Sequence, residues 1–152
     1  MSLKDRLGDD IKAAMKARDK VRLEAVRGIK KALLEKEIEL RAEGKDALSE
    51  TDELELLTKQ AKQRRDSIAQ YSQAGRDDLV QQETQELEVI ETYLPQQLSD
   101  NEIAAAVDAA IAKAGASTAK DLGKVMGPLV KELKGRADGQ KIQALVKAKL
   151  GG

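Results

Sequence analysis

Aliphatic side chains recur three and four residues apart along most of this chain, and nowhere do they alternate with polar residues. This spacing places them on one face of a helix, whereas a strand would need a period of two. No internal repeat or low-complexity tract interrupts the pattern. The sequence therefore predicts an all-α protein whose helices bury aliphatic stripes.

The core of such a protein has to be aliphatic, because the 152 residues include no Phe or Trp and only two tyrosines, Tyr71 and Tyr93. The chain has no Cys and no His, which excludes disulfides, thiol nucleophiles, Ser-His chemistry and zinc sites. We therefore predict no cofactor and no metal. The first residues mix both charges and lack a long apolar run, so we expect no membrane association and a cytoplasmic location.

Capping residues predict where the first helices begin and end. The first helix should run to about Arg18, and Asp19 should cap the second. The polar run 41–50 is typical of a loop, and it ends at Ser49, with Asp52 placed to complete a capping box. A third long helix should follow.

A helical hairpin is predicted around Gly75. We expect Gly75 to end the third helix and Asp77 to cap the fourth. The fourth helix should carry its aliphatic stripe as far as Leu94, because Pro95 cannot continue a helix.

Two charged residues, Arg64 and Glu83, fall on the apolar stripes of this hairpin. In an antiparallel arrangement about Gly75 they lie within about a turn of each other. A buried charge without a partner costs several kcal/mol, so we predict that the two side chains pair and fix the register of the hairpin.

The segment YLPQQLSDNE is the strongest boundary signal in the chain. Pro95 ends one helix, and Ser99 with Glu102 forms a capping box that opens another. We predict three segments: an elongated N-terminal helical hairpin or bundle at 1–94, a linker at 95–98, and a small three-helix C-terminal domain at 99–152.

Turn residues divide the C-terminal domain into its helices. Gly115 should end the first of them, and Ser117 or Thr118 should cap the second. Gly135 should then cap the C-terminal end of the second helix, and Asp138 should open the third.

Basic residues are concentrated near the C-terminus, where residues 120–152 carry eight Lys and Arg against three Asp and Glu. Such an excess indicates an anionic partner, although a solvated helix face gives the same count. Drawn as one helix, the region gathers its aliphatic residues on one side. Four lysines lie within about 80° of one another on the other side: Lys120, Lys124, Lys131 and Lys134.

Gly127 lies in the middle of these lysines and would let another backbone come close, either that of a neighbouring helix or a phosphate chain. Pro128 should kink the helix or break it at Gly127. Neither glycine-rich nucleotide fingerprint is present, and no strand precedes the region. Because the chain offers almost no aromatic side chains to stack bases, phosphates of folded, double-helical RNA fit better than single strands.

Four motifs occur in order along the chain: QAKQRRDSIAQYSQAGRDDLV, ELEVIETYLPQQLS, GKVMG and GRADG. In these motifs, and from about Leu3 to Leu150, the chain resembles the YqeY family. The resemblance extends to the C-terminal tail of the GatB subunit of the tRNA-dependent amidotransferase. In that enzyme the tail is a helical module that helps engage tRNA, while glutamine hydrolysis and transamidation occur elsewhere. The resemblance therefore implies a role on tRNA without catalysis.

The positions that match the last two motifs are Gly123, Lys124 and Gly127 in GKVMG and Gly135, Arg136, Asp138 and Gly139 in GRADG. Pro128 departs from the family pattern. The predicted RNA-binding residues are Lys120, Lys124, Gly127, Lys131, Lys134, Arg136 and Lys141.

Three functions remain open at this point. The first is a non-catalytic tRNA-binding protein or amidotransferase accessory, with tRNA and amidotransferase or aminoacyl-tRNA synthetase components as its partners. The second is a component of an amide-forming carbon–nitrogen ligase that uses glutamine as amido donor, for which no acid–base or nucleophile group is recognisable. The third is a helical protein–protein adaptor acting through the long N-terminal helices. Salt-dependent binding of tRNA and co-purification discriminate among them.

Overall fold

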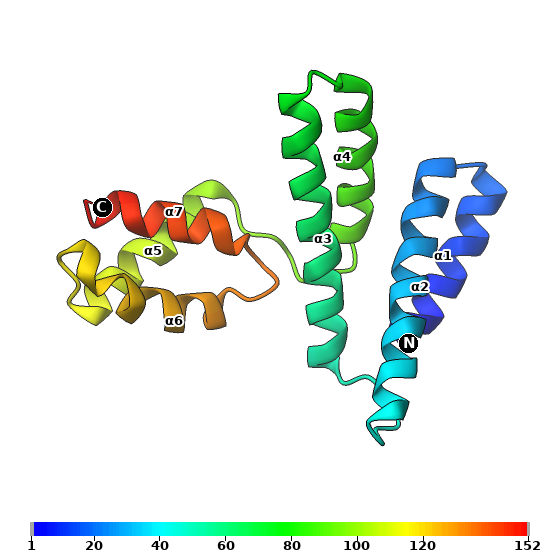
Figure 1. Ribbon diagram of the computed structural model, residues 1–152, viewed down its shortest axis with the longest axis horizontal. Coiled ribbons are helices and arrows are strands. Elements are labelled where there is room, and N and C mark those ends of the chain that lie inside the picture. Colours follow the sequence, from blue (N-terminus) through cyan, green and yellow to red (C-terminus); the bar gives the residue numbers. More distant parts are fainter. Residues whose placement is uncertain (1, 152) are drawn as a thin grey trace. The chain divides into compact units, whose positions relative to one another are not determined.

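The computed structural model describes residues 2–151, and these residues form seven α-helices, one 3₁₀ turn and no strand. The prediction of an all-α protein is confirmed for this part of the chain. The helices fall into two compact units, divided between Leu94 and Pro95 (Figure 1).

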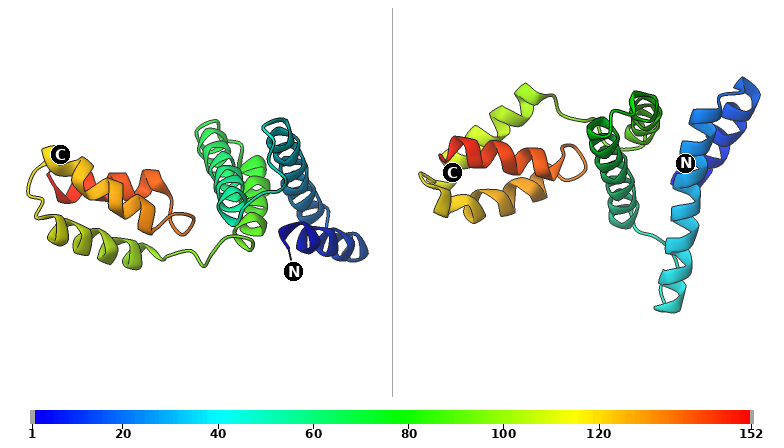
Figure 2. Two further views of the ribbon diagram at one scale, coloured as in Figure 1. Left: turned by 90° about the horizontal axis from the view of Figure 1, so that it is seen from below. Right: turned by 45° about the horizontal axis from the view of Figure 1, so that its top comes forward.

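The first unit contains α1 (Leu3–Ala17), α2 (Lys20–Ala42), α3 (Glu50–Gln73) and α4 (Asp77–Glu91). α1 and α2 form one antiparallel hairpin, α3 and α4 form another, and α2 lies between α1 and α4 (Figures 1 and 2). Its core holds mainly aliphatic side chains from all four helices: Leu3, Leu7, Val26, Ile29, Leu33, Leu57, Ala61, Ile90 and, just after α4, Tyr93.

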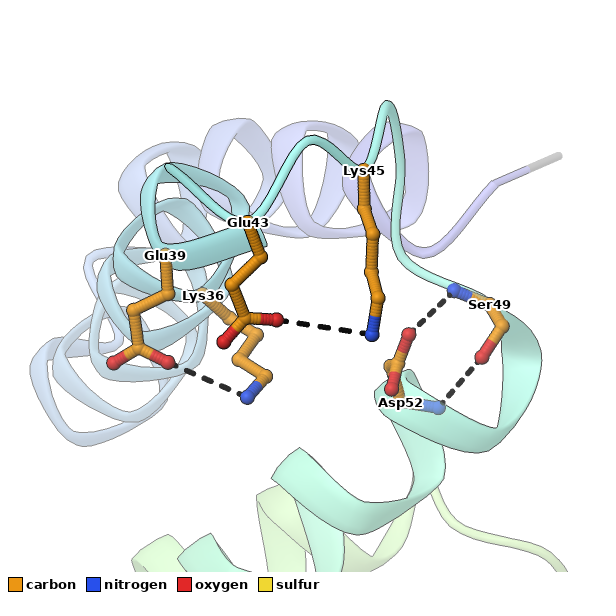
Figure 3. A network of polar contacts seen from close by, with 6 residues as sticks. All are labelled: Lys36, Glu39, Glu43, Lys45, Ser49 and Asp52. Atoms are coloured by element: carbon orange, nitrogen blue, oxygen red, sulfur yellow. Dashed lines mark hydrogen bonds and ion pairs between the residues drawn. The ribbon is translucent and has the colours of Figure 1, made fainter. Parts of the chain in front are cut away.

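The predicted caps at Arg18, Asp19 and Ser49 are confirmed, but the predicted loop at 41–50 begins two residues too early, because α2 continues to Ala42. Arg18 ends α1 in the left-handed conformation, and the carboxylate of Asp19 accepts a hydrogen bond from the N–H of Arg22 at 3.1 Å. At α3 the Asp52 carboxylate accepts from the Ser49 N–H at 3.0 Å, and the Ser49 hydroxyl accepts from the Asp52 N–H at 3.1 Å (Figure 3). These bonds hold the pKa of Asp52 below its ordinary value.

The predicted ends of α4 are wrong by one residue at its start and by three at its finish. Arg76, not Asp77, is the N-cap, and it makes no side-chain capping bond. Asp77 instead lies in the first turn, where a carboxylate meets the positive end of the helix dipole. α4 ends at Glu91 because the next N–H groups bond carbonyls only three residues back, with Leu94 bonding Glu91 at 3.1 Å.

Tyr93 connects the end of α4 to α1. Its hydroxyl donates a hydrogen bond to the Asp10 carboxylate, and the guanidinium of Arg6 lies 4.9 Å from the centre of its ring. Burial and the bond to Asp10 both raise the pKa of Tyr93 well above its ordinary value. The hydroxyl therefore stays protonated and acts as a donor throughout the physiological range.

Arg64 on α3 and Glu83 on α4 meet as predicted, with Arg64 Nη1 3.0 Å from Glu83 Oε2. The same nitrogen donates a hydrogen bond to Glu86 Oε2 at 3.1 Å, and the sequence reading missed this second partner. The side chains of Arg64, Glu83 and Glu86 are 27%, 13% and 12% exposed, so the cluster is partly buried. Arg64 Nε and Glu83 Oε2 are enclosed and make no hydrogen bond, although Glu83 Oε2 lies at ion-pair distance from Arg64 Nη1.

The second unit contains α5 (Asp100–Ala114), a 3₁₀ turn (Ala119–Asp121), α6 (Leu122–Glu132) and α7 (Gly139–Lys149). Each of the three α-helices packs against the other two. The core is entirely aliphatic: Ile103, Val107, Val125, Leu129, Leu133, Ile142, Val146 and Leu150.

Most predicted caps of the second unit are present. Ser99 and Glu102 form the reciprocal capping box of α5, Gly115 ends that helix with φ 63°, and Asp138 caps α7 through the N–H of Gln140. The C-cap of α6 is Leu133 rather than Gly135. Gly135 follows two residues later with φ 78°, in the left-handed region that favours glycine.

Replacing Arg64 should destabilise the first unit more than replacing either carboxylate. Arg64→Met leaves two partly buried carboxylates without a cation, whereas Glu83→Gln or Glu86→Gln leaves a one-to-one pair. We expect Arg64→Met to lower the free energy of unfolding by about 1–3 kcal/mol in urea titrations. Lys62→Met, an exposed change on the same helix, should stay within about 0.5 kcal/mol. Equal losses for all three cluster variants would contradict the shared-cation arrangement.

The same cluster predicts a pH dependence. Partial burial raises the pKa of Glu83 despite the opposing effect of Arg64, and Glu86 adds to the rise. A carboxyl group whose pKa is raised in the folded protein stabilises the fold at pH values below its ordinary pKa. That stabilisation is lost as the pH rises through the pKa of the folded protein. The stability advantage of the wild type over Glu83→Gln should therefore shrink between about pH 4 and pH 7. Urea titrations across this range would refute the prediction if the advantage grew with pH.

Candidate nucleic-acid interface

α6 separates an aliphatic face from a basic one. Val125 and Leu129 are buried in the core of the second unit, while Lys124, Gly127 and Lys131 are exposed. Lys124 and Lys131 are seven residues apart, so they share a face and lie about 10 Å apart along the helix axis. We call Lys124, Gly127 and Lys131 the α6 strip.

The interpretation of this region as one helix carrying four aligned lysines is wrong. Lys120 belongs to the 3₁₀ turn before α6, and Lys134 follows the C-cap Leu133. Only Lys124 and Lys131 are on α6 itself. The tighter 3₁₀ turn rotates the chain by about 120° per residue, so the alignment drawn at 100° does not extend back to Lys120.

Pro128 does not break α6, which continues from Leu122 to Glu132. A proline at this position removes the N–H that would bond the carbonyl of Lys124. Both Lys124 and Pro128 are exposed, so water can satisfy that carbonyl.

Gly127 has open space beside it. Apart from its two chain neighbours and the nearby backbone of α6 itself, a Cβ atom added at this position would meet no atom of the described residues within 4 Å, and the same holds for Gly123. No neighbouring helix of the second unit therefore comes close to Gly127, which excludes one of the two explanations for the glycine. The surface beside it remains accessible to an external backbone.

Arg136 is held by the segment that precedes α5. Its Nε donates to the carbonyl of Gln96 at 3.3 Å, and its own carbonyl accepts from the N–H of Leu98 at 2.9 Å. The side chain of Gln97 donates to the carbonyl of Gly135 at 2.7 Å. Arg136 thus has a structural role in closing the turn before α7, whatever it binds.

Two of the predicted RNA-binding lysines are paired with carboxylates. Lys141 on α7 donates to Asp100 on α5, which ties the start of one helix to the start of the other. Lys124 lies 3.7 Å from Asp121, and it remains largely exposed. The backbone N–H groups of Ser117 and Thr118, which bond Asp121, are the main reason that the pKa of this carboxyl is lowered.

The seven predicted RNA-binding residues are therefore not equivalent. Lys124, Gly127 and Lys131 lie together on α6, and Lys120 and Lys134 flank that helix in the chain. Arg136 and Lys141 make contacts that stabilise the unit. The pairing of Lys141 could not be found from sequence, because its partner Asp100 is 41 residues away.

The first unit has its own hollow, a groove of about 510 Å³ between α2 and α3. Gly28, Ala32 and Leu56 contribute its small and apolar lining, and side chains of both charges surround them. Mixed charge does not select an anion. Within residues 2–151 no cluster of three or more Asp or Glu side chains is arranged to hold a metal ion, and no helix is both long and apolar enough to cross a membrane.

These features define an all-α protein whose second unit presents a small basic strip on a short helix. The chain belongs to the Yqey-like protein family, whose sequence profile matches residues 4–150. The resemblance noted in the motifs is thereby confirmed.

Curated relatives carry the name "Altered inheritance of mitochondria protein 41, mitochondrial". The protein from Lachancea thermotolerans is 41% identical over 90 residues, which cover 59% of this chain and 46% of the relative. The protein from Saccharomyces cerevisiae is 37% identical over 90 residues, covering 59% and 47%. The chain thus matches just under half the length of these curated relatives. Their names place them in mitochondria, so a cytoplasmic location for this chain stays a prediction.

The glycines of α6 should limit the stability of the second unit. Gly123→Ala should raise the free energy of unfolding by about 0.5–1 kcal/mol, because alanine favours a helix and no other segment lies within 4 Å of the added Cβ. Gly127→Ala should stabilise by less, because the ring of Pro128 disfavours a Cβ on the residue before it in a helix. Thermal unfolding of the two variants checks this order, and a larger gain for Gly127→Ala would contradict it.

Proposed function

We propose that this protein is a non-catalytic tRNA-binding module that contacts the phosphates of folded RNA through the α6 strip. The observation that carries the proposal is the open surface around Gly127, which lies between two exposed lysines on one helix face. Lysine supplies a point charge for a phosphate, and the missing side chain leaves room for a sugar–phosphate backbone beside the helix.

The composition of the chain supports binding by shape and charge rather than by base reading. Its two tyrosines both lie in the first unit, so the second unit has no aromatic side chain on which a base could stack. A duplex region of RNA presents phosphates and 2′-hydroxyls across a shallow groove, and binding there does not depend on sequence. The resemblance to the GatB tail supports an accessory role, in which the module holds tRNA for an amidotransferase or an aminoacyl-tRNA synthetase.

The salt dependence of tRNA binding tests the number of phosphate contacts. If Lys124 and Lys131 each neutralise one phosphate, the logarithm of affinity should fall against the logarithm of salt with a slope of about −2. So few contacts imply weak binding. Fluorescence anisotropy with labelled, unfractionated tRNA between about 50 and 200 mM salt measures the slope.

Charge reversal on α6 should remove this binding. Lys124→Glu with Lys131→Glu should weaken binding of all tRNAs at least about tenfold, with helicity and melting temperature nearly unchanged. Lys12→Glu with Lys16→Glu, both exposed on α1, is the matched control with the same change in net charge. Gly127→Ala should weaken binding, because its methyl group occupies the surface that the phosphate chain approaches. If the α1 control abolished binding and the α6 variant did not, the interface would lie elsewhere.

A further inference from the structure

One arc of α2 holds only basic and aliphatic residues between Arg27 and Arg41. Counted at 100° per residue from the buried Leu33, this arc runs from about 60° to 160°. Its members are Arg27, Lys30, Lys31, Leu34, Ile38 and Arg41. We call these six residues the α2 basic face. The neighbouring acidic residues lie outside the arc, with Glu37 near 40° and Glu35 near 200°.

The aliphatic residues of this face are exposed although they contribute nothing to the core. Leu34 is 37% exposed and Ile38 is 65% exposed, and one helical turn separates them, so they form adjacent parts of one surface. The buried stripe of α2, with Val26, Ile29 and Leu33, points in a different direction. α1, α3 and α4 contact α2, and Lys31 lines the groove between α2 and α3. The remaining residues of the face do not line that groove, and all but the half-buried Lys30 are exposed.

The cations of the face have no acidic partner within the part of the chain that is described. Arg27, Lys30, Lys31 and Arg41 take part in no ion pair there. Elsewhere on α2, Lys36 lies 3.3 Å from Glu39, and Glu37 is paired with Lys4 of α1 at 3.4 Å. The arrangement thus leaves four positive charges around an exposed aliphatic pair.

We propose that the α2 basic face docks an acidic amphipathic helix of another protein. Aliphatic side chains of that helix cover Leu34 and Ile38, and its carboxylates pair with the surrounding cations. An amphipathic partner helix packed on α2 supplies apolar side chains at spacings of three and four residues. Its charged residues at the edge of the contact complement the cations of α2. The proposal is independent of the tRNA role, which rests on the second unit.

Two other anionic partners fit this face less well. A phosphate backbone would neutralise the cations but has no apolar group to cover Leu34 and Ile38. A helix that lies in a lipid surface turns its whole apolar face into the lipid. Here the larger apolar face of α2 is buried in the core, and only two aliphatic side chains remain outside.

Binding of a defined probe to the full chain tests the proposal. The probe is a fluorescein-labelled peptide of about 20 residues, designed as an amphipathic helix with leucines at the a and d heptad positions and glutamates beside them. A second peptide of the same composition has its leucines spread around the helix. Fluorescence anisotropy should show saturable binding of the first peptide, and binding at least about tenfold weaker for the second.

Variants then assign the binding to the face. Leu34→Gln with Ile38→Gln, and separately Arg27→Glu with Lys31→Glu, should each weaken binding about tenfold or more. Met15→Gln, which removes a 55% exposed side chain from α1, is the control and should change nothing. Circular dichroism should show unchanged melting for these surface variants.

Several outcomes would overturn the proposal. They are an absence of binding, equal binding of the two peptides, or binding that the Leu34 and Ile38 substitutions do not affect. If the wild type bound tRNA, or vesicles of phosphatidylcholine and phosphatidylserine, and the Leu34→Gln, Ile38→Gln variant did not, the partner would be RNA or lipid, respectively. If sedimentation showed self-association that the same variant abolished, the occupant would be a second copy of this chain.

Discussion

Burial of narrow aliphatic stripes holds both units together, because the chain has no Phe or Trp to bury a large area at a single position. The second unit shows this most simply, since its core consists only of Ile, Val and Leu side chains from three helices. Such side chains contribute about 1.5–3 kcal/mol each when fully buried, so each helix has to present several of them at the helical period. One face of each helix is thereby committed to packing, and the opposite faces can carry other chemistry.

The Arg64 cluster is the main interruption of an aliphatic stripe in the first unit. Two carboxylates and one guanidinium occupy the seam between α3 and α4, and one oxygen and one nitrogen are enclosed without hydrogen bonds. Aliphatic residues at these positions would pack without that cost. A cluster of this kind stabilises one register of the hairpin, because a shift of one residue would separate Arg64 from both Glu83 and Glu86. Specificity of pairing is our hypothesis for its presence.

Local signals were predictable from sequence and contacts between distant segments were not. The caps at Asp19, Ser49 and Ser99 involve residues within three positions of each other, so the chain contains the whole motif in one stretch. The bond of Arg136 to the Gln96 carbonyl spans 40 positions and leaves no local trace. The start of α4 was predicted only to within one residue. Asp77 is common both as an N-cap and in the first turn of a helix, so the local sequence does not decide between the two positions.

The neighbours of the cations distinguish the two basic surfaces of this protein. On α6 the residues between Lys124 and Lys131 are Gly127 and Pro128, so no long side chain stands between the charges. On α2 the residues among the cations are Leu34 and Ile38, which remain in contact with water until an apolar partner covers them. A phosphate chain gains by approaching the first surface and leaves the second incompletely covered. The two surfaces are both basic, but they favour different partners. The residues between the cations determine whether a polar phosphate chain or an apolar side chain can replace the water on the surface.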